Sequence, residues 1–492
     1  MIDYTMLHFP SFKSSYSGMK VLIMGLGLHG GGLESARYLA SRGAEITVTD
    51  LRDEQALAPS IEKLQSLMDS LEGRPIRYVL GHHDMTDFEK ADMVIKNPGV
   101  RPDSPFLKAS PRIETDISLF LADCPARLTV VTGSKGKSST ASAVHWVMEA
   151  ARNQGNIPGK AYLGGNITLS PLTFLDELRS DDDVVLELSS WQLGDLKSRF
   201  REQGSRREAL LKPRAAVLTS ILPDHLDRYG TMDAYIADKR VIYQGQDQQD
   251  VTIASDDAWG HSFFAESRGR PLVYADKPLP AGTSGGWLTG PEGPGFARLL
   301  QCETVEAVPA KLRIPGYHQK KNLLAAALAL LDLGFPPNLV RDSLGRFSGI
   351  AHRLELFHEA GDIRFYNDTA ATIPEAAAAA VEAFETPPVL VTGGTDKNLD
   401  FSPLANAAAK AKALILLAGT GSDKLKTLFD HRGLSYRGPF DTVEAAVIAS
   451  LERADKGDAV VLSPGCASFG MFLNEFDRGR KWKEAVVRLA HG

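Results

Sequence analysis

The stretch of sequence with the clearest chemistry is the glycine loop Gly133–Ser139, which carries two lysines and three serines. It follows the apolar, β-branched run 129–132 and precedes a segment, 141–149, that is typical of a helix. Exposed backbone N–H groups at a helix N-terminus bind polyphosphates. Within the loop, Lys137 can lie along the β- and γ-phosphates of a nucleotide, and the Ser138 hydroxyl can bind Mg²⁺.

The glycine loop matches a short form of the phosphate loop, Gly-x-x-Gly-Lys-Ser. The full pattern has a glycine at position 131, where this chain has Val131. An ordinary strand-to-helix turn is the alternative. The Lys-Ser pair and the strand and helix patterns around it favour phosphate binding.

Three further residues in this part of the chain could bind a metal. The apolar run 183–188 predicts a buried strand that delivers Glu187 to the place where a second Mg²⁺ ligand is expected. A surface glutamate is the alternative. From its spacing, His225 could be either a metal ligand or a polar core residue. The position of Lys239 on the helix after residue 230 favours a surface lysine.

A second glycine loop lies near the start of the chain. Gly25-x-Gly27-x-x-Gly30 follows the strand-like run 20–24, and Asp50 comes about 20 residues later. This is the dinucleotide pattern, in which a nucleotide phosphate lies on the first helix. A plain strand-helix-strand turn is the alternative. The turn 96–99 follows another strand, 91–95, and ligands gather at such strand ends in parallel sheets.

The order of the elements predicts an α/β protein of three domains, since 492 residues exceed one core. We expect an N-terminal extension (1–17), a Rossmann-like nucleotide-binding domain (18–125), a central P-loop-type ATPase domain with a mainly parallel sheet (126–348) and a C-terminal Rossmann-like domain (349–492). Further strands are expected at 215–219, 365–368, 389–392, 414–417 and 459–462. Helices are expected at 323–333 and from 374, and turns and hairpins at 271–295.

Composition excludes several classes of function. The net charge of −6 gives no reason to expect nucleic-acid binding, and the basic run 199–207 is predicted to be a solvated loop. Three widely spaced cysteines form neither a disulfide framework nor a zinc site, which indicates a reducing compartment. The first twenty residues have no apolar core of signal-peptide length, and no run reaches membrane-span length. We therefore expect a cytoplasmic protein without membrane insertion.

Taken together, these motifs resemble the Mur ligases over nearly the whole chain. The resemblance rests on 133–138, 318–322, His352-Arg353 and Asp368, and the runs 187–193, 218–229 and 463–468 are similar to the D-glutamate-adding branch. It implies that ATP activates a carboxylate as an acyl phosphate, which an amine then displaces. The implied substrates are UDP-N-acetylmuramoyl-L-alanine and D-glutamate, in peptidoglycan precursor synthesis, with a monomer expected.

The resemblance also implies roles for single residues. Lys137, His225, Lys239 and Arg353 would be catalytic. Of two Mg²⁺ ions, one would be held by Ser138 and Glu187 and the other by His225 and Lys239, the lysine as a CO₂-derived carbamate. ATP contacts would be Gly133, Ser134, Lys135, Gly136, Lys137, Ser138, Ser139, Asn322, Arg353 and Asp368. Substrate contacts would be Leu28, His29, Asp50, Arg52, Asn97, Gly99, Asn166, Gln192, Thr372, Lys397, Ser468 and Phe469.

The chain departs from the family pattern at two positions near the implied amino-acid site. Ala370 stands where the family often has a lysine, and Glu475 where an aromatic residue is usual, with Phe476 beside it. L-Glutamate or a diamino acid therefore stays open as the added amino acid. A folylpolyglutamate-synthase-like ligase, a nicotinamide-dependent oxidoreductase and a nucleotide-binding switch are the alternative functions.

Overall fold

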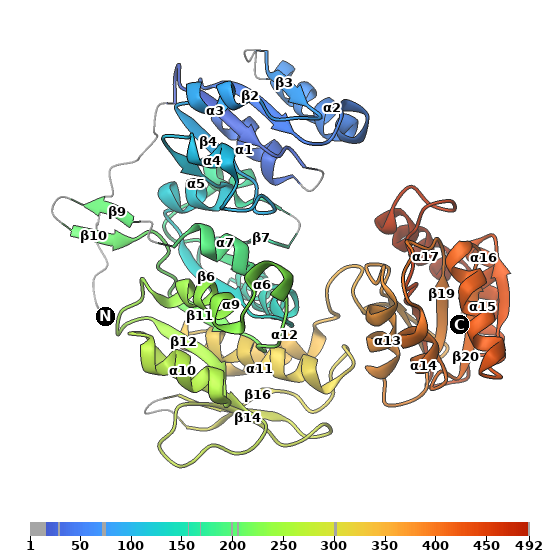
Figure 1. Ribbon diagram of the computed structural model, residues 1–492. Coiled ribbons are helices and arrows are strands. Elements are labelled where there is room, and N and C mark those ends of the chain that lie inside the picture. Colours follow the sequence, from blue (N-terminus) through green and yellow to red (C-terminus); the bar gives the residue numbers. More distant parts are fainter. Residues whose placement is uncertain are drawn as a thin grey trace. The chain divides into compact units, whose positions relative to one another are not determined.

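Three large sheets form the framework of the chain, in a computed structural model that describes residues 16–27, 30–70, 75–155, 157–167, 169–197, 200–203, 206–299 and 303–490. The chain divides into two units. Figure 1 labels the helices and strands along the chain. Unit 1 comprises Met1–Trp287, Ala297–Val305 and Ala325–Leu339, and unit 2 comprises Leu288–Phe296, Glu306–Leu324 and Val340–Gly492. Most of the predicted extension 1–17 lies outside the described residues.

The first sheet is a parallel sheet of five strands in the order β3-β2-β1-β4-β5. Its elements are β1 (Lys20–Met24), α1 (Gly31–Ala40), β2 (Glu45–Asp50), α2 (Glu54–Ser70), β3 (Arg77–Leu80), α3 (Met85–Lys90), β4 (Met93–Lys96), α4 (Pro105–Lys108), β5 (Ile113–Glu114) and α5 (Asp116–Asp123). The strand order reverses between β1 and β4, where Met24 is in register with Lys96. Ligands bind at such a switch point, and both the first glycine loop and the 96–99 turn begin there.

The second sheet has nine strands in the order β16-β15-β14-β13-β12-β11-β6-β8-β7. Its strands are β6 (Arg127–Thr132), β7 (Ala161–Gly165), β8 (Asp183–Glu187), β11 (Ala215–Leu218), β12 (Val251–Ser255), β13 (Arg270–Ala275), β14 (Gly285–Leu288), β15 (Gly295–Arg298) and β16 (Val305–Val308). The helices of this region are α6 (Lys137–Asn153), α7 (Ser190–Asp195), α8 (Leu226–Tyr229), α9 (Met232–Lys239), α10 (Ala258–Glu266), α11 (Tyr317–Asp332) and α12 (Pro337–Arg346). The strands β6 and β8 are parallel neighbours, so their ends lie at the same edge.

One sequence prediction in this region is confirmed in part, and another is wrong. The segment 271–295 was expected to form turns and hairpins rather than helix. This segment, all of whose residues are described, contains no helix, and β14 and β15 are neighbouring strands joined by the turn 289–294, but β13 and β14 pair in parallel. The basic run 199–207 was expected to be a solvated loop, yet β9 (Phe200–Gln203) and β10 (Arg206–Ala209) pair as antiparallel strands. Residue 199 lies outside the described residues. In both cases the strands pair through backbone hydrogen bonds. Turn residues and charged residues in the sequence do not predict which strands pair in this way.

The third sheet lies in unit 2 and has the order β17-β18-β22-β19-β20-β21. Its elements are β17 (Glu355–Ala360), β18 (Ile363–Asn367), α13 (Pro374–Glu382), β19 (Val389–Gly393), α14 (Ser402–Ala408), β20 (Ala413–Leu417), α15 (Thr420–His431), β21 (Arg437–Phe440), α16 (Val443–Leu451), β22 (Ala459–Leu462) and α17 (Glu475–Leu489). The pair β17–β18 is antiparallel, and the other pairs are parallel.

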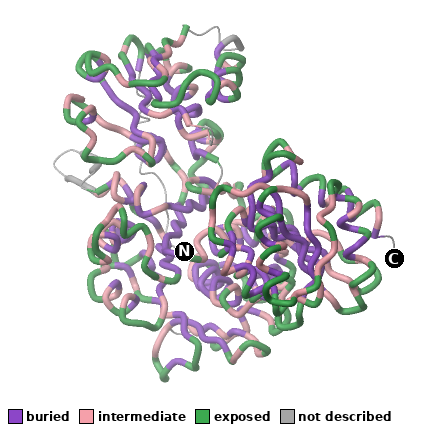
Figure 2. Tube along the Cα trace, turned by 45° about the vertical axis from the view of Figure 1, so that its right-hand side comes forward, coloured by how far each residue is buried: buried purple, intermediate pink, exposed green. Residues whose placement is uncertain are grey.

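Alternate residues of the strands pack against helices on opposite faces of the sheet. In β19, Val389 and Val391 belong to the apolar cluster that includes Trp482 of α17, whereas Leu390 belongs to the cluster that includes Leu404 of α14. Figure 2 shows the buried residues following the strands through the interior. A sheet covered on both faces is what a mainly parallel α/β fold requires, and the predicted fold class is confirmed. In the described part of the chain, no helix has the length and apolar character needed to cross a membrane.

Candidate functional site

The phosphate loop lies between the end of β6 and the start of α6. Gly136 caps the helix in the left-handed region, with a φ of 91°, and Gly133 has a φ of 143°. A Cβ at Gly133 would lie 1.9 Å from the Thr219 hydroxyl oxygen, so only glycine fits. The Lys137 ammonium donates to the carbonyl oxygen of Ser134 at 3.0 Å. The helix begins at Lys137, four residues earlier than predicted, and this places Ser138 in its first turn.

Lys239 is buried against the phosphate loop. Its Nζ atom donates to the carbonyl oxygen of Gly133 at 2.8 Å, and the residue is 1 % exposed. Burial, helped by the nearby charge of Lys137, lowers the pKa of Lys239 to about 7. A surface position for this lysine, which its spacing alone favoured, is therefore wrong.

Glu187 ends the buried strand β8 and is 1 % exposed. Its Oε1 atom accepts a hydrogen bond from the Asn166 side chain at 3.1 Å. Its Oε2 atom is buried and has no hydrogen-bond partner among the described residues. An unpaired buried carboxylate oxygen is costly, so it fits a cation ligand. The alternative of a surface glutamate is wrong.

His225 lies at the start of α8 in a left-handed conformation with a φ of 53°. Its ring is 5.0 Å from the Trp191 ring and 6.4 Å from the Tyr235 ring. The Tyr235 hydroxyl in turn pairs with the Ser134 hydroxyl of the phosphate loop at 3.0 Å. The His225 side chain is 46 % exposed, which contradicts the polar-core alternative.

The residues that could hold a metal thus include a serine and a lysine. Among the described residues, no group of three or more His, Cys, Asp and Glu could hold a metal ion. The set Ser138, Glu187, His225 and Lys239 requires Lys239 to act as an oxygen ligand, which an unmodified ammonium cannot do. Its role in metal binding stays a prediction.

Gln192, a predicted substrate contact, is held within α7. Its Oε1 atom accepts hydrogen bonds from the backbone N–H and the hydroxyl of Ser189, both at 3.0 Å, in a capping box. Gln192 is 5 % exposed. The side chain is therefore fixed in orientation just after Glu187, and its contact with substrate stays a prediction.

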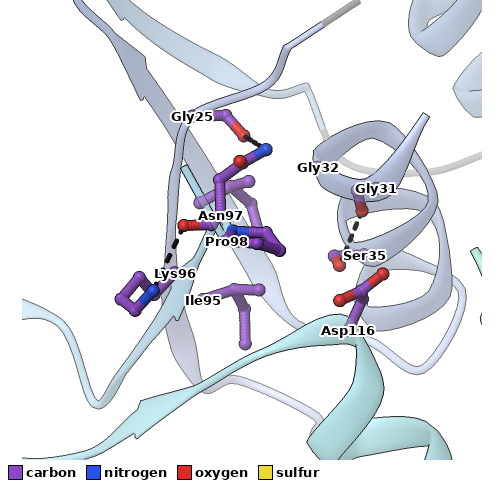
Figure 3. Close-up of a pocket in the computed structure, with 10 residues that line it drawn as sticks. Gly25, Gly31, Gly32, Ser35, Ile95, Lys96, Asn97, Pro98 and Asp116 are labelled. Carbon is purple, nitrogen blue, oxygen red and sulfur yellow. Dashed lines mark hydrogen bonds between the residues drawn. The ribbon is translucent and has the colours of Figure 1, made fainter. Parts of the chain in front are cut away.

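The first glycine loop and the 96–99 turn form a second candidate site, where a small pocket lies (Figure 3). The Asn97 amide donates to the Gly25 carbonyl oxygen at 3.4 Å, and its oxygen accepts from the Gly99 N–H at 3.0 Å. Asp50 accepts from the backbone N–H groups of Gly27 and Arg52. The structure thus brings Asp50, Arg52, Asn97 and Gly99 together. Leu28 and His29 lie outside the described residues.

The charged residue of this pocket that sequence reasoning missed is Asp116. Asp116 starts α5 and lines the pocket. It accepts from the Ser170 hydroxyl at 3.1 Å and from the Ile117 N–H at 2.9 Å. Burial raises the pKa of Asp116. A sequence signal existed in Thr115, a helix-capping residue that marks the start of α5.

In unit 2, Asp368 follows β18 and is almost fully buried. It accepts from the Ser463 hydroxyl at 2.6 Å and from the Leu354 N–H at 3.1 Å. Burial raises the pKa of Asp368 to about 7, and the charge of Arg353 opposes this shift. The amide of Asn322, on α11, donates to the Gln319 side chain at 3.2 Å. Asn322, Arg353 and Asp368 are the nucleotide contacts predicted in unit 2, and these contacts stay predictions.

The predicted amino-acid contacts lie on loops that follow three adjacent parallel strands, β18, β22 and β19. Thr395 and Ala467 exchange backbone hydrogen bonds at 3.0 Å, which joins two of these loops. The Lys397 ammonium is 5.5 Å from the centre of the Phe469 ring, and Phe469 is 57 % exposed. Phe476 instead packs on His352, with ring centres 5.3 Å apart. The aromatic side chain beside Lys397 is therefore Phe469.

Arg478 is another residue that the sequence did not indicate. This guanidinium is 1 % exposed. It donates to the hydroxyl and carbonyl oxygens of Thr369 and to the carbonyl oxygen of Cys466. It therefore fixes two of the three loops to α17. An arginine inside a helix carries no sequence signal for this role.

Comparison with known proteins decides the family. Family models match the chain as the Mur ligase MurD-like N-terminal domain (residues 19–118), the Mur ligase middle domain (131–330) and the Mur ligase glutamate ligase domain (352–466). A UDP-N-acetylmuramoylalanine–D-glutamate ligase of Treponema pallidum (strain Nichols) is 38% identical, covering 96% of this chain and 98% of the relative. The chain belongs to the Mur ligase family. A ligase of the same name from Roseiflexus sp. (strain RS-1) is also 38% identical, with the same coverage.

Solved structures agree on the fold of this Mur ligase. The UDP-N-acetylmuramate–alanine ligase of Thermotoga maritima superposes with a TM-score of 0.54 at 18% identity, covering 96% of this chain and 99% of that chain. A UDP-N-acetylmuramoyl-L-alanyl-D-glutamate–2,6-diaminopimelate ligase superposes with a TM-score of 0.54 at 17% sequence identity. The match covers 92% of this chain and 94% of that chain. The predicted three-domain α/β organisation is confirmed. The boundaries at 125/126 and 348/349 stay predictions.

Proposed function

We propose that this Mur ligase joins D-glutamate to UDP-N-acetylmuramoyl-L-alanine, with ATP hydrolysed to ADP and phosphate. One observation carries the proposal: Lys137, the buried amine of Lys239 and the unpaired oxygen of Glu187 all lie at the edge where β6 and β8 end. The Lys137 ammonium suits a polyphosphate, and the unpaired carboxylate oxygen of Glu187 suits the Mg²⁺ that accompanies it. The names of the full-length relatives support the choice of substrates.

The proposed reaction begins when the alanine carboxylate of the muramoyl substrate attacks the γ-phosphorus of ATP. The β–γ P–O bond breaks, ADP leaves and an acyl phosphate forms. The backbone N–H groups of the loop 133–139 would hold the phosphates, and the Lys137 ammonium would offset the charge that develops on the transferred phosphoryl group. The glutamate amine then attacks the acyl carbon, phosphate leaves and the amine loses a proton.

Mg²⁺ would be held by the Ser138 hydroxyl and by Glu187, and a second ion by His225 and Lys239. Bound Mg²⁺ supplies charge neutralisation on the phosphate oxygens. The residues present fit the first ion because Glu187 has an unpaired buried oxygen. They fit the second only if Lys239 becomes anionic.

Carbamylation of Lys239 would provide that anionic oxygen. CO₂ reacts with a neutral amine, and a pKa of about 7 leaves a large fraction of Lys239 neutral at neutral pH. The burial that lowers this pKa is therefore the property that supports the modification. An ordinary surface lysine would be almost wholly protonated at the same pH.

The uridine diphosphate would bind at the first glycine loop, with Leu28, His29, Asp50, Arg52, Asn97 and Gly99 as contacts. The muramoyl group would contact Asn166 and Gln192. Adenine and ribose would contact Asn322 and Asp368, with Arg353 near the phosphates. The incoming glutamate would contact Thr372, Lys397, Ser468 and Phe469, since a lysine next to an exposed ring suits a carboxylate on a short carbon chain. We place the reaction in the cytoplasm and expect a monomer.

Phosphate release from Mg-ATP tests the proposal. The purified protein is given UDP-N-acetylmuramoyl-L-alanine and, in parallel, D-glutamate, L-glutamate or a diamino acid. We expect release with D-glutamate alone. Release with another amino acid would move the specificity to the loop that carries Ala370 and to Glu475. No release with any of them would contradict the muramoyl assignment and favour the folylpolyglutamate-synthase-like alternative.

A further inference from the structure

A buried ion pair joins two segments of unit 1 that the proposed function assigns to opposite ends of one substrate. Lys96 ends β4, and Asp195 ends α7. The Lys96 Nζ atom is 2.7 Å from the Asp195 Oδ2 atom, and the two side chains are 3 % and 8 % exposed. The partners are 99 positions apart in sequence, and no local pattern predicts their contact.

On the side of the first sheet, Lys96 controls the turn that follows β4. Its ammonium also donates to the carbonyl oxygen of Val100 at 3.0 Å, which closes the turn that contains Asn97 and Gly99. Asn97 follows Lys96 directly and contacts Gly25 of the glycine loop. Figure 3 shows Lys96 and Asn97 side by side at the pocket. The ammonium therefore joins the turn that carries the proposed uridine diphosphate contacts to Asp195.

On the side of the second sheet, Asp195 belongs to the short helix that follows Glu187. Gln192 lies three residues before Asp195, so the two share one face of α7. The capping box of Ser189 and Gln192 fixes the start of the same helix. The position of the Asp195 carboxylate therefore sets the position of the proposed muramoyl contact.

A second buried contact crosses between the same two regions. The Ser170 hydroxyl, on the loop that follows Asn166, donates to Asp116 at 3.1 Å. Asp116 and Lys96 line the same pocket. Arg42 and Asp176 also pair across these regions, at 2.5 Å, but the Asp176 side chain is 61 % exposed. Of these three contacts, the two near the pocket are buried.

We propose that the Lys96–Asp195 ion pair is a positioning device that fixes the distance between the nucleotide end and the muramoyl end of the substrate site. This inference rests on the proposed function. Neither residue is assigned a contact with the reacting atoms, so both are positioning residues. A buried ion pair is a poor source of stability compared with an apolar pair, but breaking it by removing one partner leaves a costly unpaired charge. A role in fixing geometry explains why a pair of this kind is present.

The test compares binding of UDP with binding of UDP-N-acetylmuramoyl-L-alanine by titration calorimetry. We expect Asp195→Asn to leave the UDP affinity within about twofold and to weaken binding of the full substrate about tenfold, one decade being about 1.4 kcal/mol. The KM for the full substrate should rise accordingly, and the KM for ATP should not change. Asp176→Asn is the matched control, because it removes an exposed carboxylate from the other ion pair, and it should change neither affinity.

The double variant Lys96→Met/Asp195→Leu separates positioning from folding. It replaces the ion pair with an apolar pair, and we expect it to keep the melting temperature while still weakening full-substrate binding. An equal loss for UDP and for the full substrate in Asp195→Asn would overturn the positioning role, as would no loss for either. The positioning role would also be overturned if the wild-type protein bound UDP and UDP-N-acetylmuramoyl-L-alanine with equal affinity. A wild-type protein that does not bind UDP would instead contradict the proposed function itself.

Discussion

The capping glycines of the two glycine loops of unit 1 have similar backbone angles, whereas the side chains near the two loops differ. Gly30 caps α1 with a φ of 91° and a ψ of −24°, and Gly136 caps α6 with a φ of 91° and a ψ of −9°. Neither helix start has a side-chain cap. Each therefore presents free backbone N–H groups to an anion.

The charges near the two loops differ. The second loop has Lys137, Lys239 and the unpaired carboxylate oxygen of Glu187. The first loop has Asp50 and Asp116, both already accepting hydrogen bonds from the protein. Similar capping glycines would thus allow the phosphate binding that we propose at both loops, and the side chains nearby would decide whether the phosphate is transferred or only held. We call the loop 133–139 the transferring loop and the loop 25–30 the holding loop.

The largest effect on turnover is expected from substitution of Lys137 in the loop 133–139. Lys137→Ala should lower kcat by about 10³-fold, since one preorganised donor to developing charge is worth roughly 10²–10³ in rate. The ATP contact proposed for Lys135 is made by its backbone N–H, and its side chain is 73 % exposed, so Lys135→Ala should change kcat by less than about threefold. Phosphate release measures both. A Lys137→Ala protein with unchanged turnover would contradict the assignment of this loop.

Lys239→Ala should lower kcat by about 10²-fold, because one metal ligand is lost. Short carboxylic acids should restore part of the activity if the carbamate serves only as an oxygen ligand. Activity is measured with and without acetate or propionate. An absence of rescue at any concentration would leave the carbamate role without support.

The carbamate should also follow the pKa of Lys239. That pKa is lowered to about 7 by burial, so the neutral amine that reacts with CO₂ rises from about one tenth of molecules at pH 6 to about nine tenths at pH 8. With ¹³C-labelled bicarbonate at a fixed CO₂ concentration, the carbamate NMR signal should form faster at the higher pH. A rate that still rises about tenfold per pH unit above pH 8 would contradict the lowered pKa.

At the holding loop, Asn97→Ala should raise the KM for the UDP substrate about tenfold, since it removes a polar contact and loosens the turn at Gly99. The KM for ATP should stay the same. A change of equal size in both constants would show that the two loops do not act separately.

The smallest effect is expected for Gly30→Ala. A Cβ there has nothing within 4 Å, so only the left-handed φ is strained, at about 1 kcal/mol. Gly133→Ala should be far more damaging, because its Cβ would overlap the Thr219 hydroxyl. Thermal unfolding compares the two variants. Equal losses of stability would contradict this explanation.

Local patterns in the sequence predicted the strands and the glycine loops well. The runs around β6 and β8 are apolar and β-branched, and their strand ends place Glu187 beside the phosphate loop as expected. The parallel pairing of β13 with β14 was missed because Gly- and Pro-rich turns favour the prediction of a hairpin whether the strands pair in parallel or antiparallel. The start of α6 was predicted too late because the first turn of the helix, from Lys137, overlaps the glycine loop pattern and lacks the apolar spacing of a helix.

Contacts between distant segments could not be predicted. The burial of Lys239 against Gly133, the Lys96–Asp195 pair and the hydrogen bonds of Arg478 join residues that are about ten to more than a hundred positions apart. A lysine in a helix pattern looks the same whether it is buried or exposed. Only tertiary packing separates these cases, and it is packing that lowers the pKa of Lys239.

The most direct test of the comparison is a crossed binding measurement on two variants. UDP and Mg-ADP are titrated by calorimetry into the wild-type protein, Lys137→Ala and Asn97→Ala. We expect Lys137→Ala to weaken Mg-ADP binding and leave UDP binding unchanged, and Asn97→Ala to weaken UDP binding and leave Mg-ADP binding unchanged. If either variant weakened both nucleotides equally, or if UDP and Mg-ADP competed for one site, the separation into a transferring loop and a holding loop would be contradicted.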